Sequence, residues 1–391
     1  MKRFSAQYVL TNSGPLLKRA VITTGDDGTI IYVEDTGGNL KESRGLEYYN
    51  GLIVPGFVNC HAHLELSHLK GAIPEGTGLP GFLDGIRTLR DFNSEEILSS
   101  ASSADSYMHD EGIVLCADIC NTPDTFGLKK KSHIRYINLP EVFGIDPEKA
   151  VKRMNEINKV AAAAEESGLI YYVVPHSAYS VSLSLFRLLK EKTKNNRITS
   201  IHFMESEAER QFFTDSNNPL FKSYEESGLL HGGLQVPKDH TDAVLNEMTL
   251  SGNLILVHNA YAEKEIVEKI NSRGNTFWCL CPGSNLYIEN RIPPLKMLIS
   301  EGCEIVIGTD SLASNHELSI LSELKILQKN FPSLNPEDLI RWATINGAKA
   351  LYEAETYGKI APGMKPGLLL LENLDLVNFK LLPETSVKRL I

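Results

Sequence analysis

The chain has 391 residues and a formal net charge of −10, from 39 Lys and Arg against 49 Asp and Glu. A hydrophobic content of 42% and a charged content of 23% are typical of a globular protein with a large core, which excludes wholesale disorder. The acidic balance argues against a nucleic-acid partner, because no excess of Lys and Arg is available to release counterions from a phosphate backbone. The length suits two or three average domains, or one barrel-sized domain with an accessory.

The membrane and secretory classes are also disfavoured. No apolar run approaches the roughly 18–20 residues of a membrane-spanning helix. No sustained apolar stretch follows the basic start at Lys2 and Arg3, so a signal peptide is not expected. The 6 cysteines include no Cys-x-x-Cys pair, and we expect them to be buried thiols in a reducing compartment. The prediction is a cytoplasmic protein without a membrane partner.

The two ends of the chain have the pattern of short strands separated by turns. Near the N-terminus the strand candidates are Tyr8–Leu10, Ala20–Ile22 and Thr29–Val33. After Leu351 the strand pattern returns, at Leu368–Leu371. We therefore expect residues 1–54 and 356–391 to form together one small β-sandwich domain.

Between the two ends, short apolar segments alternate with longer segments of helical pattern. The helical segments are Pro147–Ser167, Ser182–Lys194, Glu263–Arg273, Pro293–Glu301 and Leu318–Asn330. The strand candidates are Leu52–Val58, Ile113–Ile119, Ile134–Leu139, Ile170–Val174, Ile198–His202, Leu254–His258, Thr276–Leu280 and Glu304–Ile307. This alternation predicts an α/β fold, a parallel (β/α)8 barrel of the TIM type, over residues 55–355. A doubly wound sheet has a similar alternation, but its usual Gly-x-Gly-x-x-Gly motif is missing.

Polar side chains gather at the predicted carboxyl ends of four of these strands, where a barrel carries its chemistry. They are His61 and His63 at the first strand, His202 and Glu205 at the fifth, His258 at the sixth and Asp310 at the eighth. In an extended segment residues i and i+2 point to one side, so His61 and His63 can face one ion. A lone histidine there is more often a hydrogen-bonded core residue, but the joint occurrence favours a metal site. Nitrogen and oxygen ligands of this mix suit Zn²⁺ or Fe²⁺ better than Ca²⁺.

These residues carry a family resemblance. The segment Pro55–Glu65 resembles the opening metal motif of the amidohydrolase superfamily. His202-x-x-Glu205, His258 and Gly308-Thr309-Asp310-Ser311 are similar to its deaminase and chlorohydrolase branch, and most similar to aminodeoxyfutalosine and S-adenosylhomocysteine-type nucleoside deaminases. The resemblance implies a metal-dependent hydrolase that removes ammonia from an adenine-type nucleoside by attack of metal-bound hydroxide. The nucleosides considered are aminodeoxyfutalosine, S-adenosylhomocysteine, methylthioadenosine and adenosine.

The resemblance also implies a role for each residue of the site. One divalent metal ion, Zn²⁺ in first place and Fe²⁺ in second, would be bound by His61, His63, His202 and Asp310. The fourth strand end, Val173–Tyr179, has no lysine to bridge a second ion. Asp310 would accept a proton from the attacking hydroxide, Glu205 would protonate the ring nitrogen beside the attacked carbon, and His258 would orient the nucleophile.

Five further residues are predicted to bind the substrate. The resemblance places His176 against the substrate and Ser314 in the turn after Asp310. It places Glu65 either near the ribose hydroxyls or behind the residues that contact the substrate. Arg87 and its neighbour Arg90 lie in the long first loop, where they would suit a carboxylate-bearing nucleoside or belong to a surface helix. Glu141, at the end of the third strand, is the fifth residue.

Other functions remain open at this stage. The same groups could deaminate guanine or another aminoheterocycle, or hydrolyse a carbon–halogen or amide bond. A barrel that binds without turnover is disfavoured because every ligand position and Glu205 are filled. The expected partner is a small molecule, and the sequence leaves a homodimer open.

Overall fold

The computed structural model describes all residues except 90–92, 216, 230–234 and 249. Within this described part, eight parallel strands form two four-stranded sheets. One sheet has the order β6 (Phe57–Ala62), β7 (Ile113–Cys120), β8 (Arg135–Val142) and β9 (Val174–Pro175). The other has the order β10 (Ile198–Phe203), β11 (Asn253–His258), β12 (Thr276–Leu280) and β13 (Glu304–Ile307).

The two sheets meet at both of their edges, at the carboxyl ends of the strands. A parallel bridge joins Ala62 to Asp310, and another joins Ser177 to His202. At these junctions the amide of Asp310 donates to the carbonyl oxygen of His61 at 3.0 Å, and the amide of His202 donates to that of His176 at 2.8 Å. The fold is therefore α/β and TIM-barrel-like, and its edges are joined by the residues that the sequence selects for chemistry.

Two strand predictions need correction. The apolar run Leu52–Val58 is two strands: its first part ends β5 (Leu46–Pro55), and its second part begins β6. The break falls at Gly56, where a Cβ would lie 2.4 Å from Cγ1 of Val114 and 2.6 Å from the carbonyl oxygen of Pro366. The predicted strand Ile170–Val174 reaches β9 only at its last residue, and upstream of it Tyr171 makes a single bridge to Asn138.

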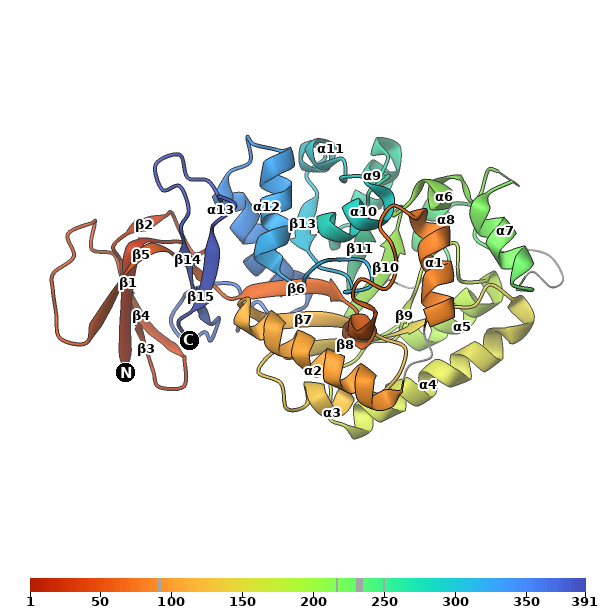
Figure 1. Cartoon of the computed structure of the whole chain (residues 1–391), viewed down its shortest axis with the longest axis horizontal. Helices are drawn as coiled ribbons and strands as arrows, with labels where there is room; N and C mark the ends of the chain where they lie inside the picture. The colour runs from red at the N-terminus through yellow and green to blue at the C-terminus, as the bar shows by residue number, and fades with distance from the viewer. Residues whose placement is uncertain (90–92, 216, 230–234, 249) are drawn as a thin grey trace.

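Helices lie around the two parallel sheets (Figure 1). The α-helices are α1 (Gly78–Leu89), α2 (Ser94–Asp110), α3 (Phe126–Lys129), α4 (Ala150–Glu166), α5 (Leu183–Thr193), α6 (Glu207–Gln211), α7 (Pro219–Glu226), α8 (His240–Leu245), α9 (Lys264–Asn271), α10 (Pro282–Glu289), α11 (Leu295–Ser300), α12 (Ile320–Asn330), α13 (Pro336–Arg341) and α14 (Gly347–Ala350). Turns of other helical type are η1 (Leu64–Leu69), η2 (Pro147–Lys149) and η3 (Trp342–Asn346).

The helices predicted from periodicity all occur, because both their apolar faces and their caps are local signals. In α4 the buried residues Met154, Ile157, Val160, Ala161 and Ala164 recur at the spacing of one helix face. The side chain of Ser182 accepts from the amide of Leu185 at the start of α5, and Ser319 accepts from Ser322 in the same way at the start of α12.

The two ends of the chain meet in one sheet at one side of the barrel, where both termini lie (Figure 1). Its described strands are β15 (Ser386–Arg389), β14 (Leu368–Glu372), β5, β1 (Lys2–Val9), β3 (Val21–Thr24) and β4 (Ile30–Glu34) in spatial order, with β2 (Leu17–Lys18) paired to β1. These strands form a single sheet, so the predicted β-sandwich is not confirmed.

The interior of the barrel is apolar. Its buried side chains include Val58, Leu115, Ile137, Val257 and Val306, one from each of five strands. Five of the cysteines are buried, namely Cys60, Cys116, Cys120, Cys279 and Cys281, and all six are free thiols. In the described part of the chain, no helix is both long enough and apolar enough to cross a membrane.

Candidate active site

The four predicted metal ligands come together at the carboxyl ends of β6, β10 and β13. The Nε2 atoms of His61 and His63 lie 3.1 Å apart. His61, His63 and His202 each contribute one ring nitrogen, and these three nitrogens lie within 4.8 Å of one another. Oδ1 of Asp310 lies 3.4 Å from Nε2 of His63 and 3.6 Å from Nε2 of His61. All four side chains are buried, so three nitrogens and one carboxylate oxygen face one small volume.

Asp310 is held so that one of its oxygens faces the histidines. Its other oxygen, Oδ2, accepts hydrogen bonds from Oγ of Ser284 at 2.6 Å and Oγ of Ser314 at 2.7 Å. The backbone of Asp310 is left-handed, with φ of 59°, a conformation that non-glycine residues rarely adopt and that functional sites retain. The two serines therefore fix the carboxylate with Oδ1 free to bind an ion.

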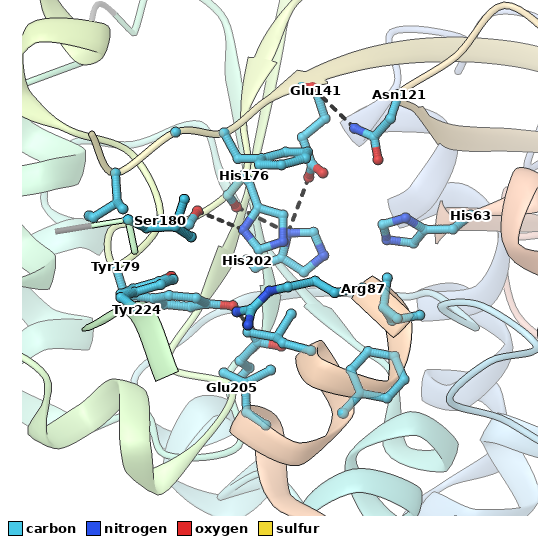
Figure 2. Close-up of a pocket in the computed structure, with 18 of the residues that line it drawn as sticks. His63, Arg87, Asn121, Glu141, His176, Tyr179, Ser180, His202, Glu205 and Tyr224 are labelled. Atoms are coloured by element: carbon cyan, nitrogen blue, oxygen red, sulfur yellow. Dashed lines mark hydrogen bonds and ion pairs between the residues drawn. The ribbon is translucent and has the colours of Figure 1, made fainter. Parts of the chain in front are cut away.

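His202 is oriented through its other ring nitrogen. Nδ1 donates to the carbonyl oxygen of His176 at 3.0 Å and lies 3.3 Å from Oε1 of Glu141 (Figure 2). Because Nδ1 donates this hydrogen bond, Nε2 is the ring nitrogen that would bind a metal ion after losing its own proton. Glu141, His176 and His202 also lie within metal-binding reach of one another. This second group does not act as a separate metal site, because its shared histidine has Nδ1 already engaged.

Charges at the site favour a bound cation. Burial would lower the pKa of His202, but the hydrogen bond and the charge of Glu141 outweigh it and raise the pKa to about 10. Burial and the charge of His61 lower the pKa of His63 to about 3. Burial would raise the pKa of Asp310, yet its hydrogen bond with His61 and the charge of His63 hold it well below its usual range. Ionised carboxylates therefore attract positive charge to the position that the imidazoles surround.

Glu205 is buried beside this cluster. Its Oε1 accepts a hydrogen bond from the hydroxyl of Tyr179 at 2.7 Å, and its Oε2 lies 3.6 Å from Nε2 of His258. Burial raises the pKa of Glu205 to about 8; the charge of His202 opposes this rise, and the charge of Glu209 adds to it. A carboxyl with a raised pKa can hold a proton and donate it to a bound molecule.

The turn that carries Glu205 is fixed by a second carboxylate. Glu209 accepts from the amide of Glu205 at 2.7 Å and from the amide of Met204 at 2.9 Å, and Met204 is left-handed with φ of 48°. Glu209 was not among the predicted site residues. A local signal exists, because Ser206-x-x-Glu209 is a capping-box pattern, and Oγ of Ser206 accepts from the amide of Glu209.

His258 lies beside Oε2 of Glu205, the oxygen that does not accept from Tyr179. Its backbone has φ of 77°, and its Nδ1 lies 3.4 Å from Nδ2 of Asn285. Burial lowers the pKa of His258 well below its usual range, so its ring is neutral. A neutral imidazole with Nε2 toward Glu205 can donate or accept one hydrogen bond in the cavity.

His176 forms part of the same wall. Its ring stacks on that of His202, with centroids 4.5 Å apart and planes at 22°. Nδ1 lies 2.9 Å from the hydroxyl oxygens of both Ser177 and Ser180. These contacts occupy Nδ1, so Nε2 is the ring nitrogen that remains for a ligand.

One cavity of about 370 Å³ connects these residues with an apolar region. Its polar end is lined by His63, Glu141, His176, His202, Glu205, His258 and Asp310, and its apolar end by Leu79, Phe82, Leu83, Ile86, Tyr224 and Leu229. Figure 2 shows His63, Glu205 and the aromatic side chain of Tyr224 around this space. The volume is that of a small-molecule site, and its long apolar wall comes from α1 and the α7 region.

The amidohydrolase family model matches residues 52–388. The chain belongs to the amidohydrolase family. It is 26% identical over 366 residues to 5-methylthioadenosine/S-adenosylhomocysteine deaminase of Pyrococcus abyssi, covering 87% of this chain and 78% of that one.

Solved structures share the fold of this amidohydrolase. Aminofutalosine deaminase of Helicobacter pylori, in complex with methylthio-coformycin, superposes with a TM-score of 0.82 at 21% identity, covering 100% of both chains. An adenosine deaminase of Xanthomonas campestris with bound zinc has a TM-score of 0.70 at 18% identity, covering 95% of this chain and 84% of that one. The family resemblance inferred from the sequence is thus confirmed.

Two residues that the sequence places against the substrate do not line the cavity of the amidohydrolase. The carboxylate of Glu65 accepts from the amides of Asn121, at 3.0 Å and 3.1 Å, and Thr122, at 3.1 Å. It therefore supports the loop after β7 that brings Asn121 to the cavity. Ser314 lies behind Asp310, whose Oδ2 it binds.

The other predicted contacts lie at the cavity. His176, Glu141 and Arg87 all line it, although Glu141 faces His202. Nη1 of Arg87 donates to Oδ1 of Asp84 at 2.6 Å and to Oγ of Ser223 at 3.0 Å, which joins α1 to α7. Arg90 lies outside the described residues.

Proposed function

We propose that this amidohydrolase is a metal-dependent deaminase that removes ammonia from an adenine-type nucleoside. Aminodeoxyfutalosine, S-adenosylhomocysteine, methylthioadenosine and adenosine are the candidate substrates, in agreement with the activities in the names of the relatives. The observation that carries the proposal is the position of Glu205, a buried carboxyl with a raised pKa that lines the same cavity as four histidines and Asp310. Deamination of an amidine needs such a proton donor beside a nucleophile.

The residues present fit one divalent cation, for which we propose Zn²⁺. His61, His63, His202 and Asp310 would hold it, and three imidazoles with one carboxylate are ligands that Zn²⁺ accepts. The fit rests on the 3.1 Å approach of two Nε2 atoms and on the orientation of His202 through Nδ1. When bound, the cation would lower the pKa of a coordinated water toward about 7 and so supply a nucleophile at neutral pH.

The side chains then divide the proton transfers. Asp310, ionised at neutral pH, would take a proton from the attacking water. Glu205 would protonate the ring nitrogen beside the attacked carbon and afterwards assist the departure of ammonia. His258 would hydrogen-bond the new oxygen substituent. The reaction consumes one water and releases one ammonia, and a carbonyl replaces the exocyclic C–NH2 group while the ring carbon–nitrogen bond is retained.

The substrate is held by the remaining walls in this proposal. Nε2 of His176 would contact the base, and the apolar surface of α1 would cover the part of the nucleoside beyond the ribose. We also propose that the two parallel sheets act as one closed (β/α)8 barrel over residues 55–355. Residues 1–54 and 356–391 would form the small β domain beside it.

The test is ammonia release by zinc-loaded protein across adenosine, methylthioadenosine, S-adenosylhomocysteine, guanine and a chlorinated triazine. We expect ammonia from one or more of the adenine nucleosides and no chloride from the triazine. Release from guanine alone would replace the substrate class. No ammonia from any compound would overturn the proposal in favour of amide hydrolysis.

A further inference from the structure

We propose that Tyr179 is a positioning residue that keeps the transferable proton of Glu205 on Oε2, the oxygen nearer His258. This inference rests on the proposed function, in which Glu205 donates that proton. It concerns a residue outside the predicted catalytic, metal-binding and substrate-binding set.

Tyr179 reaches Glu205 from a different strand end. It lies in the loop after β9, whereas Glu205 follows β10, and its ring is fully buried. The ring packs edge-on against His176, at 5.8 Å and 87°, and against Phe212, at 6.3 Å and 66°. Figure 2 shows the side chain of Tyr179 directed toward the region of Glu205. These two ring contacts and its complete burial hold the side chain of Tyr179 in place.

The hydrogen bond from Tyr179 makes the two carboxyl oxygens of Glu205 different from each other. Burial raises the pKa of Tyr179 well above its usual range, so its hydroxyl keeps its proton and donates to Oε1 at 2.7 Å. Within the described part of the chain, the hydroxyl of Tyr179 donates to no acceptor other than Glu205. A proton on Oε1 would leave a buried O–H group without an acceptor, which is unfavourable. The carboxyl proton therefore belongs on Oε2.

The backbone of the same residue is fixed independently. The amide of Glu205 donates to Oε2 of Glu209 at 2.7 Å. The side chain thus has one anchor at its backbone and another at Oε1, which leaves Oε2 at 3.6 Å from Nε2 of His258. Loss of the second anchor frees the carboxyl to rotate, and the proton is then on the correct oxygen only part of the time.

The experiment is Tyr179→Phe, which retains the ring and removes the hydroxyl. We expect kcat on the preferred nucleoside to fall by about 10-fold to 10²-fold, because small misplacements of a reacting group have effects of this size. KM should stay within about twofold of wild type, since the bond acts on chemistry rather than on substrate binding. Zinc content and melting temperature should be retained.

A double-mutant cycle separates positioning from a general structural effect. In a Glu205→Gln background there is no carboxyl proton to place, so adding Tyr179→Phe should change kcat little. Tyr107→Phe is the matched control, because its hydroxyl donates to Oε2 of Glu317 at 2.6 Å on the outside of the barrel. This control should have wild-type kcat. Equal losses from Tyr179→Phe in both backgrounds would overturn the inference.

A measurement without turnover keeps the inference separate from the proposed function. At mildly acidic pH, the infrared carbonyl band of protonated Glu205 can be assigned by its absence in Glu205→Gln. If Oε1 is the carbonyl oxygen that accepts from Tyr179, the band should move to higher frequency in Tyr179→Phe. An unmoved band would overturn the inference even if wild-type protein releases ammonia. A moved band in protein that deaminates nothing would contradict only the proposed function.

Discussion

Nδ1 of His202 and Oε1 of Glu141 lie 3.3 Å apart in a buried pair behind the metal-binding position. Burial would raise the pKa of Glu141, but the charges of His176 and His202 lower it well below its usual range, so the carboxylate is ionised. The pair aligns the imidazole of His202 and makes its free nitrogen a better ligand. In the proposed metal site Glu141 would therefore act on the metal through His202 in addition to lining the cavity.

We predict that Glu141→Gln weakens zinc binding by about 10–100-fold, the usual effect of losing a carboxylate behind a metal-binding histidine. The measurement is competition with a chromophoric chelator. Wild-type zinc affinity in this variant would contradict the assignment of Glu141 to the support of His202. Glu156→Gln, on the exposed side of α4, is the matched control and should bind zinc as wild type does.

A second buried ion pair, Asp118 with Lys129, supports the chain next to His63. Oδ1 of Asp118 accepts from the amide of Leu64, the residue after His63, at 2.8 Å, and its Oδ2 pairs with Nζ of Lys129. Both side chains are fully buried, and Nζ also donates to Oδ1 of Asn138 at 3.0 Å. We predict that Lys129→Met lowers the free energy of unfolding by about 3–5 kcal/mol, because it leaves a buried carboxylate without its partner.

Urea unfolding of the metal-free protein measures this loss. The double variant Lys129→Met with Asp118→Asn should recover part of it, since the uncompensated charge is then removed. A change within about 0.5 kcal/mol for Lys129→Met, the range of surface substitutions, would contradict the account.

Activity should depend on pH through Glu205. The active form is the protonated carboxyl, so kcat should fall as pH rises through its pKa, which is about 8 without metal. A bound cation favours the carboxylate and lowers this pKa, so the alkaline limb should lie at or below about pH 8. A pH profile in which kcat rises steadily from pH 6 to about pH 9 would contradict the role of Glu205 as acid.

A variant of Glu65 tests whether this residue supports the loop after β7 or contacts the substrate directly. If it supports the loop of Asn121 and Thr122, Glu65→Ala should reduce the free energy of unfolding by about 1–3 kcal/mol, because two part-buried backbone amides lose a charged acceptor. KM should rise together with this loss of stability. A raised KM with unchanged stability would instead indicate direct contact with the substrate, as the sequence resemblance implies.

The sequence selects the side chains that cluster at this site because each of them is a local feature. His61 and His63 share one side of a strand, and Asp310 follows directly on a short buried strand, so strand ends and residue spacing are enough to find them. The helices are equally local, since apolar spacing and caps such as Ser182 are visible without the fold.

What the sequence does not predict depends on packing between separate loops. Tyr179 and Glu205 are 26 residues apart, and no spacing rule joins them. Glu65 and Ser314 form hydrogen bonds with other residues of the protein, and neither lines the cavity. The edge strand Ser386–Arg389 is polar and largely exposed, so hydrophobicity does not mark it.

The most direct test of the account compares ammonia release by wild type and Glu205→Gln, both loaded with zinc, on the preferred adenine nucleoside. Glutamine keeps the size of the side chain and an oxygen that can accept from Tyr179, but it has no carboxyl proton to give. The account predicts equal zinc content and a loss of activity of order 10²–10⁴-fold, the usual contribution of a general acid. Near wild-type turnover in Glu205→Gln would contradict it.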